Sequence, residues 1–467
     1  MLKALIDTKC HFAIKSGGHD RTPGSSNADG GVTIDLVRLN EVKVAKDRKS
    51  VKIGAGLRWL DVYTALEKEG LMVVGGRVSD VGVGGLTLGG KMIHGLTSLE
   101  TATHADGLLG GISFFSNRYG WACDNVLSYD IVLPDTSIET VTQSSQPDLY
   151  RSLRGAGASN FGIVTSFTME TFPQPNPAGI WGGSKVFAWD KAPELLRMSN
   201  KFTMETMDID PDVALISSFG YMQAYDIWWG VPIFRHTTHT NPSTWPSPFQ
   251  PYENLEGVPN TTNIAIRPLS NITLELAQSS PVGERTIYGT FTYHPSIALE
   301  QKILDLFSEQ ANSIKNISEF LPTAIIQPLS RTTIRKMKKR GGNALGITEE
   351  GPLTIFSTSW KWRHASDDDR SYAAYYRFME RAEAVAKEMR VWHPYRYINY
   401  AEATQDVWSG LGEVNLRDLR RVQRSTDPKG VFARGGLGGG YFKLNDMPGE
   451  EERKRGGTNG EGLKSEL

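Results

Sequence analysis

A short apolar run that ends in two glycines and a histidine constrains this chain more than any other stretch. It spans residues 13–20 and reads Ala-Ile-Lys-Ser-Gly-Gly-His-Asp. The apolar part is typical of the end of a strand, and Gly17 and Gly18 allow backbone angles that a side chain would forbid. Consecutive amide groups at such a turn form a concavity suited to an anion. The run predicts a loop close to a ligand, with the imidazole of His19 beside it; on this motif alone, an ordinary surface loop is the alternative.

Composition argues against several classes of function. The chain has 467 residues and a formal net charge of −1 from 51 basic and 52 acidic side chains, so no broad basic surface for nucleic acid or an anionic membrane is implied. Its two cysteines, Cys10 and Cys123, provide neither a disulfide framework nor a metal-ligand spacing, and we predict no metal site. No stretch approaches the length of a membrane span, and the first nine residues carry charges where a signal peptide needs an apolar core. The sequence leaves the localisation open.

The first 175 residues alternate strand and helix signals, which predicts an α+β fold. Strand patterns fall at 32–36, 51–56, 71–76, 125–133 and 163–165, and helical patterns at 59–66 and 148–153. Glycines at 82, 84, 85, 89 and 90 among apolar residues indicate a backbone that lies very near something flat or anionic.

A cluster of prolines at residues 173–177 predicts a domain boundary. Beyond it, strand patterns at 184–189, 286–293 and 353–362 mix with helical patterns at 192–206, 297–314 and 370–389. This mixture is typical of an antiparallel sheet covered by helices on one face. A last helix runs through Leu416, Leu419 and Val422, and the charged, glycine-rich residues from 445 onward are predicted to be disordered.

Four motifs in a fixed order carry a resemblance to a known family. They are the Ser-Gly-Gly-His turn at 16–19, the glycine run at 75–85, the glycine-rich turn and strand at 155–165, and Tyr-Ile-Asn-Tyr at 397–400 followed by residues 427–432. Together they resemble the FAD-linked oxidoreductases of the berberine bridge enzyme type, within the vanillyl-alcohol oxidase group. The resemblance implies a PCMH-type FAD-binding domain over residues 1–175, completed by residues 393–444, with a substrate domain at 180–392 and a disordered tail at 445–467.

The resemblance also implies a cofactor and the residues that hold it. The cofactor is FAD, and His19 matches the histidine that bonds covalently to the flavin 8α-methyl group. Some family members add a second link through a cysteine, but the corresponding residue here is Val78, so we expect a single histidyl bond. The residues that match the family's cofactor contacts are Ser16, Gly17, Gly18, His19, Val81, Gly82, Gly85, Gly89, Asn160, Gly162, Ile163, Val164, Tyr397 and Asn399.

Tyr400 matches the family's catalytic tyrosine. In this role it takes a proton from a substrate hydroxyl or an acidic C–H group while a hydride passes to flavin N5, and O2 reoxidises the flavin to give hydrogen peroxide. A phenol with a pKa near ~10 needs a neighbouring cation or hydrogen-bond donor to act as a base. The family usually has an aspartate two residues later, where this chain has Glu402. The implied partners are a small organic substrate and O2, and we expect a monomer.

Two departures from the family pattern give rise to other hypotheses. Only fifteen residues precede Ser16, where family members carry a further strand–helix–strand portion, so the chain is either shortened or lacks its true start. Residues 91–110 interrupt the glycine run, and we hypothesise that these twenty residues come from a retained short intron. The alternative functions are a non-catalytic remnant of such an enzyme and, less favoured, a glycine-rich scaffold without flavin that binds another protein.

Overall fold

The computed structural model describes residues 1–444 except 21, 23, 90–110, 158, 279–282, 349–350 and 441. The insertion at 91–110 and the tail at 445–467, both singled out above, lie outside the described residues. Within the described part of the chain, no helix is both long and apolar enough to cross a bilayer.

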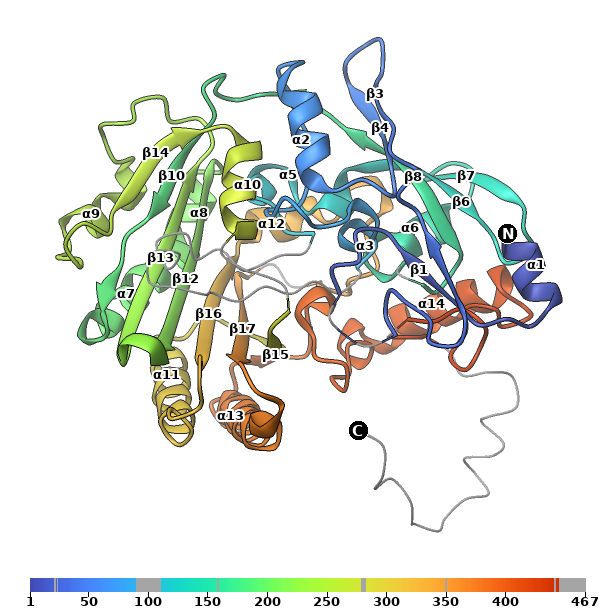
Figure 1. The fold of residues 1–467 in the computed structure, drawn as a ribbon. Helices are drawn as coiled ribbons and strands as arrows, with labels where there is room; N and C mark the ends of the chain where they lie inside the picture. Colours follow the sequence, from blue (N-terminus) through green and yellow to red (C-terminus); the bar gives the residue numbers. More distant parts are fainter. Residues whose placement is uncertain are drawn as a thin grey trace.

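The N-terminal region is built around a five-stranded antiparallel sheet (Figure 1). Its strands, in spatial order, are β3 (Val42–Val44), β4 (Ser50–Gly54), β8 (Ile163–Glu170), β6 (Val126–Val132) and β7 (Ile138–Thr142). Two small sheets accompany it: β1 (Phe12–Lys15) pairs in parallel with β2 (Val32–Asp35), and β5 (Leu71–Met72) pairs with β9 (Phe172–Pro173). The helices of this region are α1 (Leu2–Asp7), α2 (Trp59–Glu67), α3 (Val83–Leu88), α5 (Ser116–Tyr119) and α6 (Pro147–Ala156).

A second sheet of nine strands follows the proline-rich segment, and all its pairings are antiparallel. In spatial order it contains β14 (Asn263–Arg267), β10 (Ile180–Ser184), β13 (Ile227–His236), β12 (Val213–Met222), β16 (Leu321–Leu329), β17 (Leu353–Trp362), β15 (Arg285–Tyr293) and β18 (Trp392–His393), with β11 (Phe187–Ala188) beside β13. The helices within this part of the sequence are α7 (Ala192–Lys201), α8 (Met207–Ile209), α9 (Gln250–Asn254), α10 (Leu269–Gln278), α11 (Ile297–Asn312), α12 (Arg331–Lys336) and α13 (Asp368–Glu388). The chain then returns to the N-terminal region and forms α14 (Glu413–Thr426).

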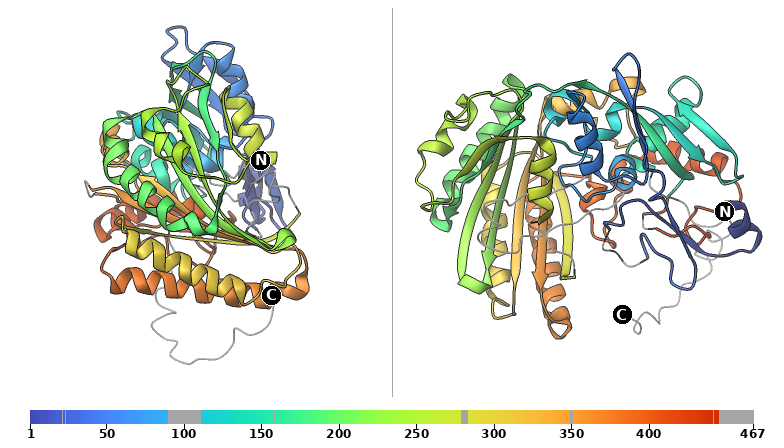
Figure 2. Two further views of the ribbon diagram at one scale, coloured as in Figure 1. Left: turned by 90° about the vertical axis from the view of Figure 1, so that its left-hand side faces the viewer. Right: turned by 45° about the horizontal axis from the view of Figure 1, so that its top comes forward.

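Both faces of the large sheet are buried, and they belong to different cores. On β12, Leu215 and Phe219 pack into the cluster that includes α7, α11 and α13. Their neighbours Ile216 and Met222 point the other way, into the core shared with the N-terminal region. Figure 2 shows α11 and α13 along one face of the sheet, as the sequence predicts. The opposite face is therefore the one that can meet a ligand held by the N-terminal region.

Three local expectations differ from the structure. Within the predicted strand at 184–189, only Ser184, the last residue of β10, and the two residues of β11 are in strands. The predicted strand at 71–76 ends at Met72. Gly75 and Gly76 lie against the ring of Trp59, where an added Cβ would come within 2.1 and 2.5 Å of ring atoms, so packing rather than strand pairing fixes this segment. The glycine run contains the helix α3, which glycine's low helix propensity conceals in the sequence.

Candidate cofactor and active site

The Ser-Gly-Gly-His turn and the glycine run meet backbone to backbone. Gly18 has a φ of +66°, the left-handed region that the sequence argument anticipated for this turn. Gly17 is required for a different reason, because a Cβ on it would lie 2.4 Å from the amide nitrogen of Gly82. The Ser16 hydroxyl joins the two motifs: it donates to the carbonyl of Ala55 over 2.6 Å and accepts from the amide of Gly84 over 3.1 Å.

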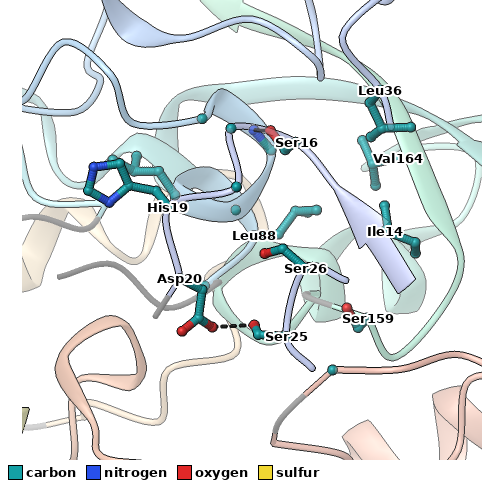
Figure 3. Close-up of a pocket in the computed structure, with 18 of the residues that line it drawn as sticks. Ile14, Ser16, His19, Asp20, Ser25, Ser26, Leu36, Leu88, Ser159 and Val164 are labelled. Carbon is teal, nitrogen blue, oxygen red and sulfur yellow. Dashed lines mark hydrogen bonds between the residues drawn. The ribbon is translucent and has the colours of Figure 1, made fainter. Parts of the chain in front are cut away.

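This contact forms one wall of an elongated cavity with about 920 Å³ of space, its open mouth included. Figure 3 shows His19 at one end and the apolar side chains of Ile14, Leu36 and Val164 at the other. Hydroxyl groups of Ser25, Ser26 and Ser159 line the cavity between them, and Ser25 donates a hydrogen bond to Asp20. An apolar end, a polar middle and glycine-lined walls suit a long ligand with an aromatic group at each end.

The C-terminal segment completes the cavity from the far end of the sequence. Ile398, Gly440 and Phe442 contribute to its lining. Asn160 fastens this segment, since its amide donates to the carbonyl of Phe442 over 3.2 Å and its side-chain oxygen accepts from the amide of Leu444 over 3.1 Å. Residues 282 positions apart in the sequence are thus held together at the cavity.

Lys443 leads to a prediction about pH. Its ammonium donates to the carbonyls of Phe432 and Ser159, and burial lowers its pKa from 10.5 to about 7, against the opposing effect of the Asp427 carboxylate. Between these two values the unfolded chain binds more protons than the folded chain, so stability rises with pH, at most by about 1.4 kcal/mol per pH unit. We expect the thermal midpoint to increase from pH 7 to pH 9 in the wild type and to increase less in Lys443→Met. Calorimetry of both variants, with exposed Lys429→Met as the matched control, checks this; equal slopes for all three would contradict it.

His19 is oriented by a carboxylate. Its Nε2 lies 3.3 Å from Oδ2 of Asp80, and the exposed fraction of the imidazole is 12%. A carboxylate in this position favours the tautomer with the proton on Nε2 and the lone pair on Nδ1. Asp80 belongs to the glycine run, so the same motif that lines the cavity also fixes the histidine.

Tyr400 lies in a buried polar cluster with two residues that sequence reasoning did not assign to the site. Its hydroxyl accepts a hydrogen bond of 2.9 Å from Nη2 of Arg77 and donates one of 3.3 Å to Oε1 of Gln327. The same Arg77 nitrogen donates to Oε1 of Gln327 over 2.9 Å. All three side chains are at most 3% exposed. Glu402 is not part of this cluster, because its carboxylate accepts from the amide and hydroxyl of Thr404.

The pKa of Tyr400 is raised, whereas the sequence argument required it to be lowered. A cation stands beside the phenol as anticipated, and Arg77 lowers the pKa of Tyr400. Burial raises this pKa by more than Arg77 lowers it, because a buried phenolate loses its solvation. Within the protein alone, Tyr400 is therefore a phenol at neutral pH.

The structure brings most of the predicted cofactor residues to the cavity. Its lining includes Ser16, Gly17, Gly18, His19, Gly82, Gly85, Gly89, Gly162, Ile163 and Val164. The other four are buried around it: Val81 packs in the core, Asn160 holds the C-terminal segment, Asn399 donates to the carbonyl of Leu86 over 3.4 Å, and the Tyr397 hydroxyl accepts from the amide of Ile112 over 3.4 Å.

Arg77 and Gln327 could have been suspected from the sequence. Arg77 is a charged residue inside the glycine run, and Gln327 is the single amide side chain in β16, a strand that is apolar apart from Gln327 and Thr323. A lone polar residue in a buried strand needs a partner and is a signal of function or structure. The pattern could not reveal that the partner is Tyr400, which is 73 residues further along the chain.

The cavity fits FAD on one direct test. A Cβ added to Gly85, which lines the cavity from α3, meets no atom of the described residues within 4 Å, whereas one added to Gly82 would lie 2.3 Å from the amide nitrogen of Gly17. Packing among the described residues explains the glycine at 82 but not the one at 85. A flat or bulky group held against α3 explains the second.

Comparisons with known proteins agree with this geometry. A family described as an FAD binding domain matches residues 1–110. FAD-dependent monooxygenase tpcD from Cochliobolus heterostrophus is 35% identical over 448 residues, which cover 94% of this chain and 81% of that protein. FAD-dependent monooxygenase FUP4 from Fusarium proliferatum is 35% identical over 435 residues, covering 91% of this chain and 79% of that protein. The structure of berberine bridge enzyme from Eschscholzia californica shares the fold, with a TM-score of 0.69 and 16% identity over 95% of this chain and 88% of that chain.

Fold, cavity and relatives together define an FAD-dependent oxidoreductase. The chain belongs to the FAD-linked oxidoreductases of the berberine bridge enzyme type, as the motifs predicted. The formed cavity and relatives that align with more than nine-tenths of the chain argue against a non-catalytic remnant.

Proposed function

We propose that the protein binds FAD in the glycine-lined cavity through a single covalent bond to His19 and oxidises a small organic substrate at Tyr400. The observation that carries this proposal is the position of His19, which lies at one end of that cavity with its ring oriented by Asp80. The apolar end, with Ile14 and Leu36, suits an adenine ring, and the glycine turns suit the diphosphate. Val78, which is buried where other family members have a cysteine, offers no second link.

Tyr400 is the proton acceptor in this proposal. Arg77 donates to its hydroxyl and stabilises the phenolate that must form before a proton can be taken from the substrate. Gln327 accepts from the phenol and fixes the direction of its hydrogen atom. The buried setting excludes water from the transfer and strengthens the interaction with Arg77.

Bound FAD would supply the acceptor for a hydride at N5, and O2 would then take up the two electrons and two protons as hydrogen peroxide. We place the reaction in secondary metabolism because a relative named bifunctional solanapyrone synthase, from Alternaria solani, is 28% identical over 95% of this chain. Fold similarity does not identify the substrate.

Acid precipitation of the purified protein tests the proposal. We expect yellow colour to remain in the wild-type pellet, because only a covalently bound flavin survives denaturation. His19→Ala should release all of its flavin into the supernatant, as measured by absorbance of both fractions. Anaerobic reduction followed by exposure to air then tests O2 as the acceptor.

His11→Ala is the matched control, since His11 precedes β1 and does not line the cavity. It should keep its flavin in the pellet. A colourless wild-type pellet with flavin in the supernatant would disprove the covalent bond, and a protein without flavin in either fraction would disprove the proposed function.

A further inference from the structure

A second, smaller hollow lies between the cofactor region and β16 of the large sheet. It has about 360 Å³ of space, its mouth included, and its walls include Arg77, Trp121, Gln327 and the apolar residues Ile112 and Leu329. We call it the donor cavity. It adjoins the Tyr400 cluster, because Arg77 and Gln327 belong to both.

The donor cavity contains three buried N–H donors without a partner among the described residues. They are Nε of Arg77, Nε2 of Gln327 and Nε1 of Trp121, on side chains that are at most 3% exposed. The Arg77 and Gln327 atoms that bind Tyr400 are different ones, Nη2 and Oε1. Arg77 and Gln327 thus each use one polar atom in the Tyr400 cluster and have a second polar atom that is available to a ligand.

The other polar groups of the donor cavity are occupied by one another. Ser116 accepts from the amide of Ser113 over 2.7 Å, and Thr333 donates to the carbonyl of Ser116 over 3.3 Å. Asn117 donates to the carbonyls of Met207 and Asp210 and accepts from Ser330. Among the described side chains that line the cavity, the polar atoms that remain available to a ligand are therefore the three N–H donors.

The charge of the donor cavity is also unbalanced. Arg77 is 3% exposed. Within the described residues it forms no ion pair with a carboxylate, and no aspartate or glutamate lines the cavity. A buried guanidinium without a counter-ion is costly, and buried charges in proteins are normally paired. A ligand that carries a negative charge would remove that cost.

We propose that the donor cavity binds an anionic oxygen of the substrate, a carboxylate or an enolate, through Arg77, Gln327 and Trp121. This inference rests on the proposed function, since it concerns the substrate that Tyr400 acts on. Three N–H donors on residues that line one cavity, one of them charged, match the lone pairs of an anionic oxygen. A neutral apolar group would leave their desolvation uncompensated. The anion would also lie next to Tyr400, whose hydroxyl shares Arg77.

Titration calorimetry of the flavin-loaded protein tests the proposal with three small probes. Benzoate represents a carboxylate, 4-nitrophenolate represents an enolate, and benzamide is the neutral analogue. We expect at least one anion to bind at least tenfold more tightly than benzamide. Trp121→Phe, which removes one donor and keeps the ring, should weaken that binding by about tenfold or more.

Trp181→Phe is the matched control, because the Trp181 indole N–H is also buried without a partner among the described residues but lies in the core on the other face of the sheet. It should bind the anion as the wild type does.

Arg77→Lys keeps the charge but loses Nε and should weaken binding even if Trp121→Phe proves unstable. If one anion binds, the proposal holds for that class; if neither exceeds benzamide, or if Trp121→Phe and Arg77→Lys both bind like the wild type, it is overturned. Flavin content is measured separately on the same samples, so a flavin-loaded protein that ignores both anions contradicts this inference alone.

Discussion

Tyr400→Phe is expected to lower the rate of flavin reduction by about 10²- to 10⁴-fold while the flavin content stays unchanged. The substitution removes only the hydroxyl that receives a hydrogen bond from Arg77 and donates one to Gln327. Because burial raises the pKa of Tyr400 more than Arg77 lowers it, the wild-type rate should increase with pH as the phenolate forms. Besides burial, the groups that shift the pKa of this phenol are Arg77, which lowers it, and Tyr288, which raises it. Stopped-flow bleaching of the flavin without oxygen, with a compound that reduces the wild type, measures both effects.

Tyr395→Phe is the matched control for this experiment. Tyr395 lies five residues before Tyr400 in the sequence and is also buried. Its hydroxyl has no hydrogen-bond partner among the described residues. It should retain the wild-type rate and the wild-type pH profile. A Tyr400→Phe enzyme that keeps the alkaline rise would show that another group takes the proton.

Local features of the fold followed from the sequence because they depend on neighbouring residues. The strand pattern at 286–293 corresponds to β15, and the helical pattern at 297–314 corresponds to α11. Both have a clear period and defined ends, for example the Ser296 side chain that caps α11. The turn at Gly18 was also foreseen, since a left-handed conformation is a property of a single residue.

The Tyr400 cluster could not be predicted in full, because its contacts join residues that are far apart in the sequence. Arg77 and Tyr400 are 323 residues apart, and Gln327 reaches them from the middle of the large sheet. The resemblance to a family identified Tyr400 but not the two residues that hold it. The helix α3 was missed for the opposite reason, because tertiary contacts around the glycine run override the weak helix propensity of its residues.

The two cavities are lined by different parts of the chain. The cavity for the cofactor is built almost entirely by the N-terminal region and the C-terminal segment, whereas the donor cavity has β16 of the large sheet as one wall. If the two proposals hold, a change on the inner face of the large sheet alters what is bound at Arg77 without altering the glycine contacts to FAD.

The contrast between Gly82 and Gly85 gives the second large expected effect, which separates packing from cofactor binding. In Gly82→Ala the new methyl group would lie 2.3 Å from the amide nitrogen of Gly17, so the two glycine motifs must move apart. Overpacking of this kind costs about 1–3 kcal/mol of stability. It also opens the wall of the cavity, and we expect this variant to lose both thermal stability and nearly all of its flavin.

Gly85→Ala should keep the fold and lose the cofactor. Its methyl group meets no described atom within 4 Å, and alanine in place of glycine inside a helix contributes about 0.5–1 kcal/mol of stability. The same methyl group points into the cavity, so flavin bound against α3 would clash with it. The measurements are flavin absorbance per mole of purified protein and the thermal midpoint of the protein stripped of free flavin. A Gly85→Ala protein that carries as much flavin as the wild type would mean that the cofactor does not contact α3 at this position, because a bound flavin there would clash with the added methyl group.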